Sequence, residues 1–409
     1  MSSHRVTAIL VLHDGARWLP KVIASLTSQT HPVNQSVAVD TGSEDGSAKL
    51  VKGARIPVFP MARDTGFGEA IAHAVSTLPK IVDPEREWIW LIHDDLLLDP
   101  NALANLIAEV DTKPSVAMAG PKLLGWHDQT HLLEIGVSIA ANGNRWTGLE
   151  PSEYDQGQRD GVHEVLAVST AGALIRRDVF EQLGGFDPNL DLFRDDVDFG
   201  WRLYSAGYTA IAVSNAIAFH AEASANERRT VDVAEAFLHR PLLLDRRNAA
   251  YVLLVNSAWW LLPILAVQLL AGAIFRAVGF LFAKLPGYAS DEILAVGALI
   301  LQPADLIKAR KVRRTNRLVP SGIVSRFIPS RWSQTRLALS RSAEWIRTQL
   351  FPVEITEVRE ISVLDENLDE GDFYIESMQN QERKKKLYMI IFGTILIAVL
   401  LVILFTKII

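Results

Sequence analysis

Residues 88–95 read WIWLIHDD, and this stretch decides the fold that the rest of the chain must fit. Its first five residues are apolar, which is typical of a strand buried on both faces of a sheet. The apolar run stops at His93, Asp94 and Asp95, which places the hard oxygen ligands of the two carboxylates at the carboxyl end of the strand. Open α/β sheets bind their ligands at that end. The stretch therefore predicts a buried strand with a divalent cation at its tip, the alternative being a turn and a helix cap near Asp99.

The regions on both sides of this strand alternate between short apolar runs and longer amphipathic ones, from Arg5 to about Ala225. Such alternation is typical of strands joined by crossover helices in a largely parallel sheet. Strands are expected at 6–12, 35–39, 57–59, 88–92, 116–120, 171–176 and 210–213. Helices are expected at 17–29, 46–51, 67–76, 101–109, 177–183 and 196–206. The carboxyl ends of the strands should therefore line one crevice.

Other strand ends carry residues suited to holding a nucleoside and its phosphates. Asp40 ends an apolar run and is followed by a Gly-Ser-Glu-Asp-Gly turn, so its side chain is expected to face a ligand. Asp14 lies at the equivalent position after the first strand. Arg63 and Asp64 precede a segment in which Gly66 leads into a helix, where backbone amides could approach a phosphate.

A second acidic cluster lies in residues 193–202, which read FRDDVDFGWR. Helix capping would employ one or two of the three acids. A third acid is more than capping requires, so Asp196, or its neighbour Asp195, is a candidate general base. Trp201 and Arg202 follow on the same predicted helix, where they either line the acceptor side or pack in the core.

His220 closes the last predicted strand region. An imidazole at that position can complete the ligand set of a cation bound by Asp94 and Asp95. A lone histidine is more often structural, so this prediction depends on the two acids lying nearby.

The composition excludes some function classes. With 409 residues, 49% of them hydrophobic, the chain exceeds one average domain and can bury a large core. The formal net charge of −6 gives no reason to expect a nucleic-acid partner. Cysteine is absent, so neither a disulfide framework nor a thiolate metal site is available, which fits a reducing location for the folded part.

Residues 249–282 are strongly apolar, but Pro263 breaks the segment and Arg276 lies inside it. A single span would leave the basic stretch that follows on the outer side, against the positive-inside tendency. We therefore predict an interfacial or re-entrant helical pair within the region 236–350, with a single span as the alternative. The basic residues from Lys308 to Arg347 then either contact anionic membrane lipids or form a solvated face.

The C-terminal end is predicted to be a membrane anchor. Residues 351–386 are rich in acids and are expected to form a poorly ordered linker, and 387–409 are expected to hold a transmembrane helix. The apolar run Leu387 to Phe405 is about 19 residues long, enough to cross a bilayer, although a buried soluble helix is the alternative. Arg383 and the lysines after it place its start on the cytoplasmic side, so we expect residues 1–235 to face the cytoplasm at the cell membrane.

Taken in order, these motifs resemble the family 2 glycosyltransferases of GT-A fold. The resemblance covers most of residues 5–225 and rests on an ordered set of segments: VDTGSEDGS, DTGFG, HDD, STAGALIRRDVFEQLGGFD, RDDVDFGWRLYSAGY and His220. The branch that it resembles most includes the bacterial rhamnosyl- and galactofuranosyltransferases that build the cell envelope. It implies a Rossmann-like, mostly parallel mixed sheet in residues 1–235.

The resemblance also implies roles. The reaction would be an inverting transfer of a sugar from a nucleotide-diphospho-sugar to a glycan or polyprenyl-linked acceptor, with Mn²⁺ or Mg²⁺. The implied donor-binding residues are Asp14, Asp40, Arg63, Asp64, Gly66 and Asp94, and the implied metal ligands are Asp94, Asp95 and His220. The implied base is Asp196 or Asp195. The implied acceptor-side residues are Gly172, Trp201 and Arg202.

Two features depart from the family's pattern. Its acidic triplet often starts with Asp where this chain has His93, which leaves open which of the next two acids binds metal. Large relatives continue into many spans, so this chain is expected to use a membrane protein partner for acceptor delivery. A catalytically silent scaffold and a nucleotidyltransferase are the alternative functions, and the latter lacks a Gly-rich basic loop for a triphosphate.

Overall fold

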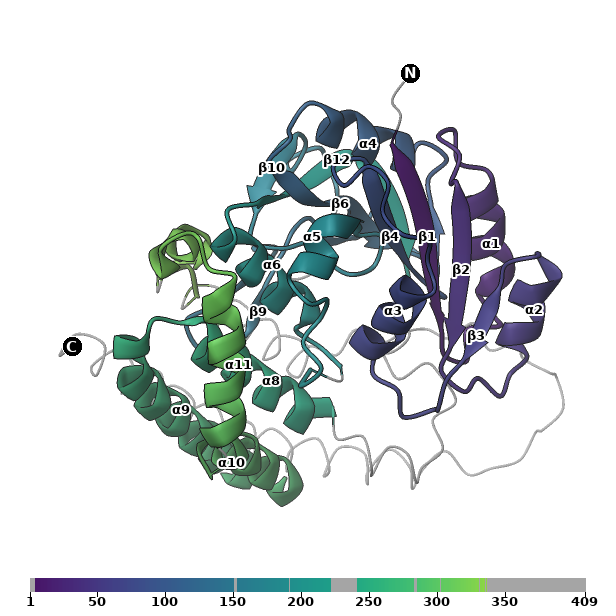
Figure 1. Cartoon of the computed structure of the whole chain (residues 1–409). Coiled ribbons are helices and arrows are strands. Elements are labelled where there is room, and N and C mark those ends of the chain that lie inside the picture. The colour runs from purple at the N-terminus through teal and green to yellow at the C-terminus, as the bar shows by residue number, and fades with distance from the viewer. Residues whose placement is uncertain are drawn as a thin grey trace, which may run out of the picture. The chain divides into compact units, whose positions relative to one another are not determined.

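A ten-stranded mixed sheet forms the centre of the described part of the chain (Figure 1). The computed structural model describes residues 4–150, 153–190, 192–221, 241–282, 285–301, 303–330, 332–334 and 336. The strand order is β10-β12-β6-β11-β4-β1-β2-β3, with β5 paired to β12 and β7 paired to β6. The strands are β1 (Arg5–Leu12), β2 (Gln35–Asp40), β3 (Val58–Pro60), β4 (Glu87–His93), β5 (Leu96–Leu98), β6 (Val116–Gly125), β7 (Leu132–Glu134), β10 (Val162–Val165), β11 (Leu174–Arg176) and β12 (Thr209–His220), and β8 (Ser138–Ile139) pairs with β9 (Arg145–Trp146) separately.

One half of the sheet is parallel, as the sequence predicts. β1 pairs in parallel with both β2 and β4, and β2 pairs in parallel with β3. The register places Leu12 opposite Asp40 and Val11 opposite His93. The carboxyl ends of β1, β2 and β4 therefore meet at one edge of the sheet, where the predicted site residues follow.

The other half of the sheet is mixed. β11 runs antiparallel to both of its neighbours, β4 and β6, whereas β12 runs parallel to β6. β12 extends well beyond the predicted strand 210–213 because a register shift between Val213 and Ile217 carries the strand past the polar residues Ser214 and Asn215. The strand therefore continues to His220, the residue expected to close this strand region.

Helices cover both faces of the sheet, because alternate side chains of each strand point to opposite faces. Val6 and Leu10 of β1 belong to a core shared with helices on one face, and Ile9 belongs to the core on the other face. The first face carries α1 (Leu19–Thr27), α2 (Ser47–Gly53) and α4 (Ala102–Asp111), and the second carries α3 (Phe67–Ser76), α5 (Arg177–Gln182), α6 (Asp195–Ser205) and α8 (Pro241–Asn256). The predicted helices lie within a few residues of those in the structure.

The helices after residue 241 extend this second face. α8 is buried there, since Tyr251 and Val252 are at most 1% exposed. The later elements are η1 (Trp259–Leu261), α9 (Leu262–Phe282), α10 (Pro286–Leu301), α11 (Pro303–Thr315) and η2 (Ser321–Phe327). α10 packs against α8 and α9, and α11 packs against α8 (Figure 1). The predicted acidic linker and terminal transmembrane helix lie outside the described residues.

Candidate active site

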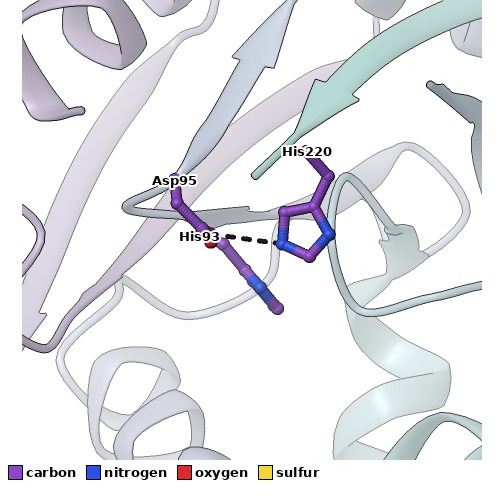
Figure 2. Close-up of side chains that lie close together, drawn as sticks. All are labelled: His93, Asp95 and His220. Carbon is purple, nitrogen blue, oxygen red and sulfur yellow. Dashed lines mark hydrogen bonds and ion pairs between the residues drawn. The ribbon is translucent and has the colours of Figure 1, made fainter. Parts of the chain in front are cut away.

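Two histidines and one carboxylate meet at the edge of the sheet. Their ligand atoms, from His93, Asp95 and His220, all lie within 4.8 Å of one another. Nε2 of His220 lies 3.2 Å from Oδ1 of Asp95, and the rings of His93 and His220 meet edge to face at 5.4 Å between centroids. Figure 2 shows the His220 ring facing Asp95, with His93 beside it. The sequence expectation that Asp95 and His220 lie together is thus met, with His93 in addition.

Backbone pairing fixes this cluster. β5 is antiparallel to the end of β12, with His220 opposite Leu96. The amide of Ala221 donates a hydrogen bond of 3.1 Å to the carbonyl of Asp95. The distance between the two ligands therefore follows from the sheet register, although they are 125 residues apart in sequence.

The cluster fits a divalent cation. A six-coordinate ion with bonds of about 2.1 Å holds neighbouring ligand atoms about 3 Å apart and opposite ones about 4.2 Å apart. The span of 4.8 Å needs only a small closure of the side chains. Imidazole nitrogens are ligands of first-row divalent metals, and among these ions a carboxylate oxygen suits Mn²⁺.

Asp94 points to a different part of the edge. Its Oδ2 accepts a hydrogen bond of 2.7 Å from the amide of His13, and the side chain is buried. A Cβ atom on Gly15 would lie 2.4 Å from this carboxylate, so only glycine fits there. Asp94 therefore lies against the turn after β1, and its predicted role in metal binding stays a prediction.

The predicted nucleoside-binding residues form a network around the same turn. Nη2 of Arg63 lies 2.8 Å from Oδ2 of Asp14, and the amide of Glu44 donates to the other oxygen. Burial raises the pKa of Asp14, but the hydrogen bonds from Arg63 and Glu44 outweigh it and hold the pKa below its ordinary value. Asp14 is thus an anion whose position Arg63 fixes. Asp40 is also buried and accepts a hydrogen bond from the amide of Ser43.

The loop before α3 keeps its predicted form. Gly66 is the N-cap of α3 and makes no side-chain cap, so the first amides of a ten-residue helix are available to a phosphate. Asp64, two residues earlier, is exposed. Gly68 packs against Phe186, and a Cβ atom there would lie 2.9 Å from that of Phe186.

The three acids of α6 have three different environments. Asp196 accepts two hydrogen bonds from Arg145 on β9, at 3.2 Å from Nε and 2.8 Å from Nη2. Arg145 also pairs with Glu134 at 2.6 Å; burial lowers the pKa of Arg145, but the charges of Glu134 and Asp196 outweigh burial and raise it. Glu134 also accepts a hydrogen bond of 3.0 Å from the amide of Ser169, and the next residue, Thr170, lies 3.1 Å from His93, which connects the candidate base to the metal cluster.

Asp195 lies beside α3. It is 5% exposed, and its Oδ1 has no hydrogen-bond partner among the described residues. A Cβ atom on Gly68 would lie 3.7 Å from this oxygen. Burial, reinforced by the charges of Asp196 and Asp198, raises the pKa of Asp195 well above its ordinary value. Asp195 is therefore the acid of this pair that is favoured in the protonated form, which leaves Asp196 as the better base.

Asp198 is a structural residue. It is fully buried and contacts Arg202 at 2.7 Å, Arg313 at 2.6 Å and Asn256 at 2.8 Å. Burial raises the pKa of Asp198, but Arg313 and Arg202 lower it further, so the side chain is ionised. This contact explains the third acid of the cluster, because it joins α6 to α8 and α11.

The predicted acceptor-side residues are packed in the interior. Trp201 is 3% exposed and belongs to the hydrophobic core, while Arg202 pairs with Asp198 and donates to the carbonyl of Leu183. Gly172 has a φ of +85° and its carbonyl accepts a hydrogen bond from the indole of Trp90. Packing accounts for all three positions.

Three residues of the site were not assigned from sequence: His93, Glu134 and Arg145. His93 stands within the predicted motif but was treated as a departure from it. Glu134 and Arg145 lie on β7 and β9, which have three and two residues and give no periodic signal.

Comparison with known proteins decides the family. The family model described as "Glycosyltransferase like family 2" matches residues 8–234, more than half of the chain. The chain is a family 2 glycosyltransferase. Its fold is of the GT-A type that the resemblance implies, a mostly parallel mixed sheet with helices on both faces.

Curated relatives of this glycosyltransferase include rhamnosyltransferases. The N-acetylglucosaminyl-diphospho-decaprenol L-rhamnosyltransferase of Mycobacterium tuberculosis is 24% identical over 283 residues, which are 63% of this chain and 86% of the relative. The O-antigen chain rhamnosyltransferase RfbN of Salmonella typhimurium is 25% identical over 218 residues, which are 53% of this chain and 66% of that protein.

Solved structures similar to the glycosyltransferase include GalNAc-T7 with UDP, GalNAc and Mn²⁺, at 12% identity and a TM-score of 0.48, covering 74% of this chain and 57% of that one. Staphylococcus aureus TarS 1–349 in complex with UDP-GlcNAc is 14% identical, with a TM-score of 0.46, covering 83% of this chain and 87% of that one.

Proposed function

We propose that this glycosyltransferase moves a sugar from a nucleotide-diphospho-sugar to a lipid-linked cell-envelope acceptor, with inversion at the sugar and with a divalent cation. The observation that carries the proposal is the cluster of His93, Asp95 and His220 at the sheet edge. The acid Asp196 is held by Arg145 and is connected to His93 through Glu134 and residues 169–170. The site therefore combines candidate ligands for a cation with a candidate base.

The donor side is the turn region around Asp14 and Asp40. The ionised Asp14 and the carboxylate of Asp40 are suited to hydroxyl and amide donors of a nucleoside, and Arg63 holds Asp14 in place. The N-terminus of α3 after Gly66 is suited to an anionic phosphate. Asp94 follows β4 directly and accepts a hydrogen bond from the amide of His13, at the turn after β1, and Asp95 is the next residue in the chain.

The departing diphosphate carries the largest charge of the reaction. His93, Asp95 and His220 would hold a cation whose chemistry is to neutralise that charge. The residues themselves form a buried carboxylate flanked by two half-buried imidazoles.

The acceptor hydroxyl must lose a proton as the new bond forms. Asp196 is the proposed base, because its Oδ2 is fixed by two hydrogen bonds from Arg145. The sugar carbon is attacked from the side opposite to the departing diphosphate, so its configuration inverts. Asp195, with its raised pKa, is less suited to accept the proton.

The name of the mycobacterial relative indicates the acceptor class. That protein acts on N-acetylglucosaminyl-diphospho-decaprenol and transfers L-rhamnose. We propose the same class here, a sugar on a polyprenyl diphosphate, with a nucleotide-activated deoxyhexose as the donor to be tested first.

The test uses the full chain in detergent micelles, a panel of nucleotide-sugars and a polyprenyl-diphospho-GlcNAc acceptor. Asp95→Asn and His220→Gln should reduce transfer at least about 100-fold, and chelation should abolish the wild-type reaction until Mn²⁺ is restored. Asp196→Asn should retain donor binding by calorimetry and lose about 10² to 10⁴ in kcat. Asp83→Asn, an exposed carboxylate, is the matched control and should leave both unchanged.

Transfer that survives chelation would disprove the cation assignment. Donor binding without turnover, unchanged by Asp196→Asn, would instead indicate a silent scaffold that kept the fold. Release of pyrophosphate from a nucleoside triphosphate would indicate a nucleotidyltransferase.

A further inference from the structure

The outer faces of α9 and α10 are apolar, unlike the outer faces of helices in water. Seventeen large apolar side chains between Trp259 and Leu301 are exposed, whereas only four are exposed in the described residues up to 221. The side of α10 that faces the protein carries two acids, Asp291 and Glu292, which are 5% and 0% exposed, beside four apolar residues. Helices on the surface of soluble proteins carry polar residues on their outer face.

α9 is apolar on both its inner and its outer face. Its inner face is a narrow stripe of small and apolar residues, Leu269, Ala273 and Ala277. The outer face is apolar along its whole length, and Val267, Ile274 and Leu281 are 69%, 49% and 57% exposed. The segment from Trp259 to Phe282 has 24 residues, reaches a mean hydropathy of 2.0 in its most apolar 18-residue stretch, and is the one described helix long and apolar enough to cross a membrane.

We infer that the outer face of α9 and α10, called the apolar face below, is a docking surface that lies in the plane of an anionic lipid bilayer. An exposed apolar surface of this extent marks an interaction site. The adjoining helix α11 carries exposed Lys308, Lys311 and Arg314, which complement anionic headgroups. Trp259 and Trp260, 73% and 60% exposed, stand at the start of the segment, and tryptophan is favoured at membrane interfaces.

Contacts on the inner side fix the orientation of the helices. The amide of Gln268 donates to the carbonyl of Ala141 at 3.0 Å, and Arg276 pairs with Glu292 at 2.8 Å. Glu292 also pairs with Arg246 of α8 at 2.9 Å. Because α8 belongs to the core of the sheet, α9 and α10 lie along the folded protein and do not project from it. Lipid can therefore reach only their outer side.

The apolar face connects to the site through one short turn. Residues 140–144 contact α9 through Ala141 and α8 through Asn144, which accepts a hydrogen bond from Arg246 at 2.6 Å. The next residue is Arg145, which holds Asp196. Docking at this face would thus place the candidate base near the surface of the membrane, where the diphosphate of a lipid-linked acceptor lies. This last step rests on the proposed function, whereas the docking surface does not.

The test reads the depth of single labels in the full chain, because the predicted terminal helix would hold the chain on vesicles whatever the apolar face does. The chain contains no cysteine, so Val267→Cys, Ile274→Cys and Leu281→Cys each introduce one site for a nitroxide label. Collision of the label with oxygen and with a water-soluble nickel complex gives its depth in vesicles of phosphatidylcholine and phosphatidylglycerol. Val82→Cys, at a position 78% exposed on the sheet domain, is the matched control.

A helix in the membrane plane should place all three labels at similar depths, about 5–10 Å below the headgroups. The 14 residues from position 267 to 281 span about 21 Å along the helix, so a spanning helix would give depths that differ by up to that amount. Such a depth gradient would overturn the inference. Nickel access equal to that at position 82 would overturn it too, as would spin–spin broadening that shows a second copy on the face.

The second part of the test removes positive charge from α11. Changing Lys308, Lys311 and Arg314 to Gln should lower the ratio of docked to undocked labels at position 274 by about 100-fold on vesicles with phosphatidylglycerol. The loss should be absent on phosphatidylcholine alone. The control changes Lys49, Lys52 and Lys80, exposed lysines of the sheet domain, to Gln and should have no effect. Equal effects of the two triple variants would contradict a role for α11 in lipid contact.

Discussion

Arg313 of α11 joins the later helices to the sheet domain through buried ion pairs. Its Nη2 lies 2.5 Å from Oδ2 of Asp187 and 2.6 Å from Oδ1 of Asp198, and its Nε donates to Asn256. The side chains of Arg313, Asp187 and Asp198 are 6%, 6% and 0% exposed. Replacing Arg313 with Met keeps most of the stem and removes the charge from two buried carboxylates.

The expected loss of stability follows from what remains around each carboxylate. Removing one partner of a buried ion pair costs about 3–5 kcal/mol. Asp198 keeps Arg202, and Asp187 keeps the hydroxyl of Tyr251 at 2.8 Å. We therefore expect the lower end, about 3 kcal/mol, for the decrease in the free energy of unfolding of Arg313→Met.

The assay is urea unfolding of the full chain in mild detergent, followed by tryptophan fluorescence. Arg86→Met is the matched control, because Arg86 and Asp83 lie 3.8 Å apart with side chains that are about half exposed. Its expected cost is about 0–1 kcal/mol. The reasoning is refuted if Arg313→Met loses no more stability than Arg86→Met.

The stability that the pair of Arg313 and Asp198 contributes depends on pH with a defined sign. Burial raises the pKa of Asp198, but Arg313 and Arg202 lower it, so the folded-state pKa lies below the ordinary value of 3.8. A depressed folded-state pKa contributes stability that is present above pH 3.8 and lost as the pH falls below it. The difference in stability between wild type and Arg313→Met should therefore narrow below about pH 4.

Two further changes test the site and its supports. Arg145→Lys removes the paired hydrogen bonds to Asp196, so kcat should fall about 10- to 100-fold while the KM for the donor stays nearly unchanged. Initial rates measure both quantities, and an unchanged kcat would show that Asp196 does not need Arg145 to hold it. Gly68→Ala places a Cβ atom 2.9 Å from that of Phe186 and should cost about 1–3 kcal/mol in urea unfolding, whereas Gly53→Ala meets no atom within 4 Å and should cost nothing.

The sequence predicted those parts of the site that depend on strand ends. His220 and Asp95 were expected to meet because each closes an apolar strand, and the carboxyl ends of such strands share an edge. The bulge that carries β12 past Ser214 was not predicted, because a bulge leaves no pattern of its own in the sequence.

Residues whose role depends on a distant partner could not be assigned. The three acids of α6 look alike in sequence, yet Asp198 is distinguished by Arg313, 115 residues further on. Arg145 reaches Asp196 from a strand of two residues. Pro263, expected to break the apolar segment, stands in the first turn of α9, where proline is tolerated and the segment divides before it.

The ladder between β5 and β12 fixes the spacing of the two ligands, and β6 supports the same end of β12. Asp95 and His220 are held by one register and one amide contact, and His220 lies opposite Gly125 of β6. Insertions in loops that leave β5, β6 and β12 intact would therefore leave the spacing of the ligands unaltered. Proteins with this architecture can therefore change the acceptor that they bind while they keep the same ligands beside the leaving group.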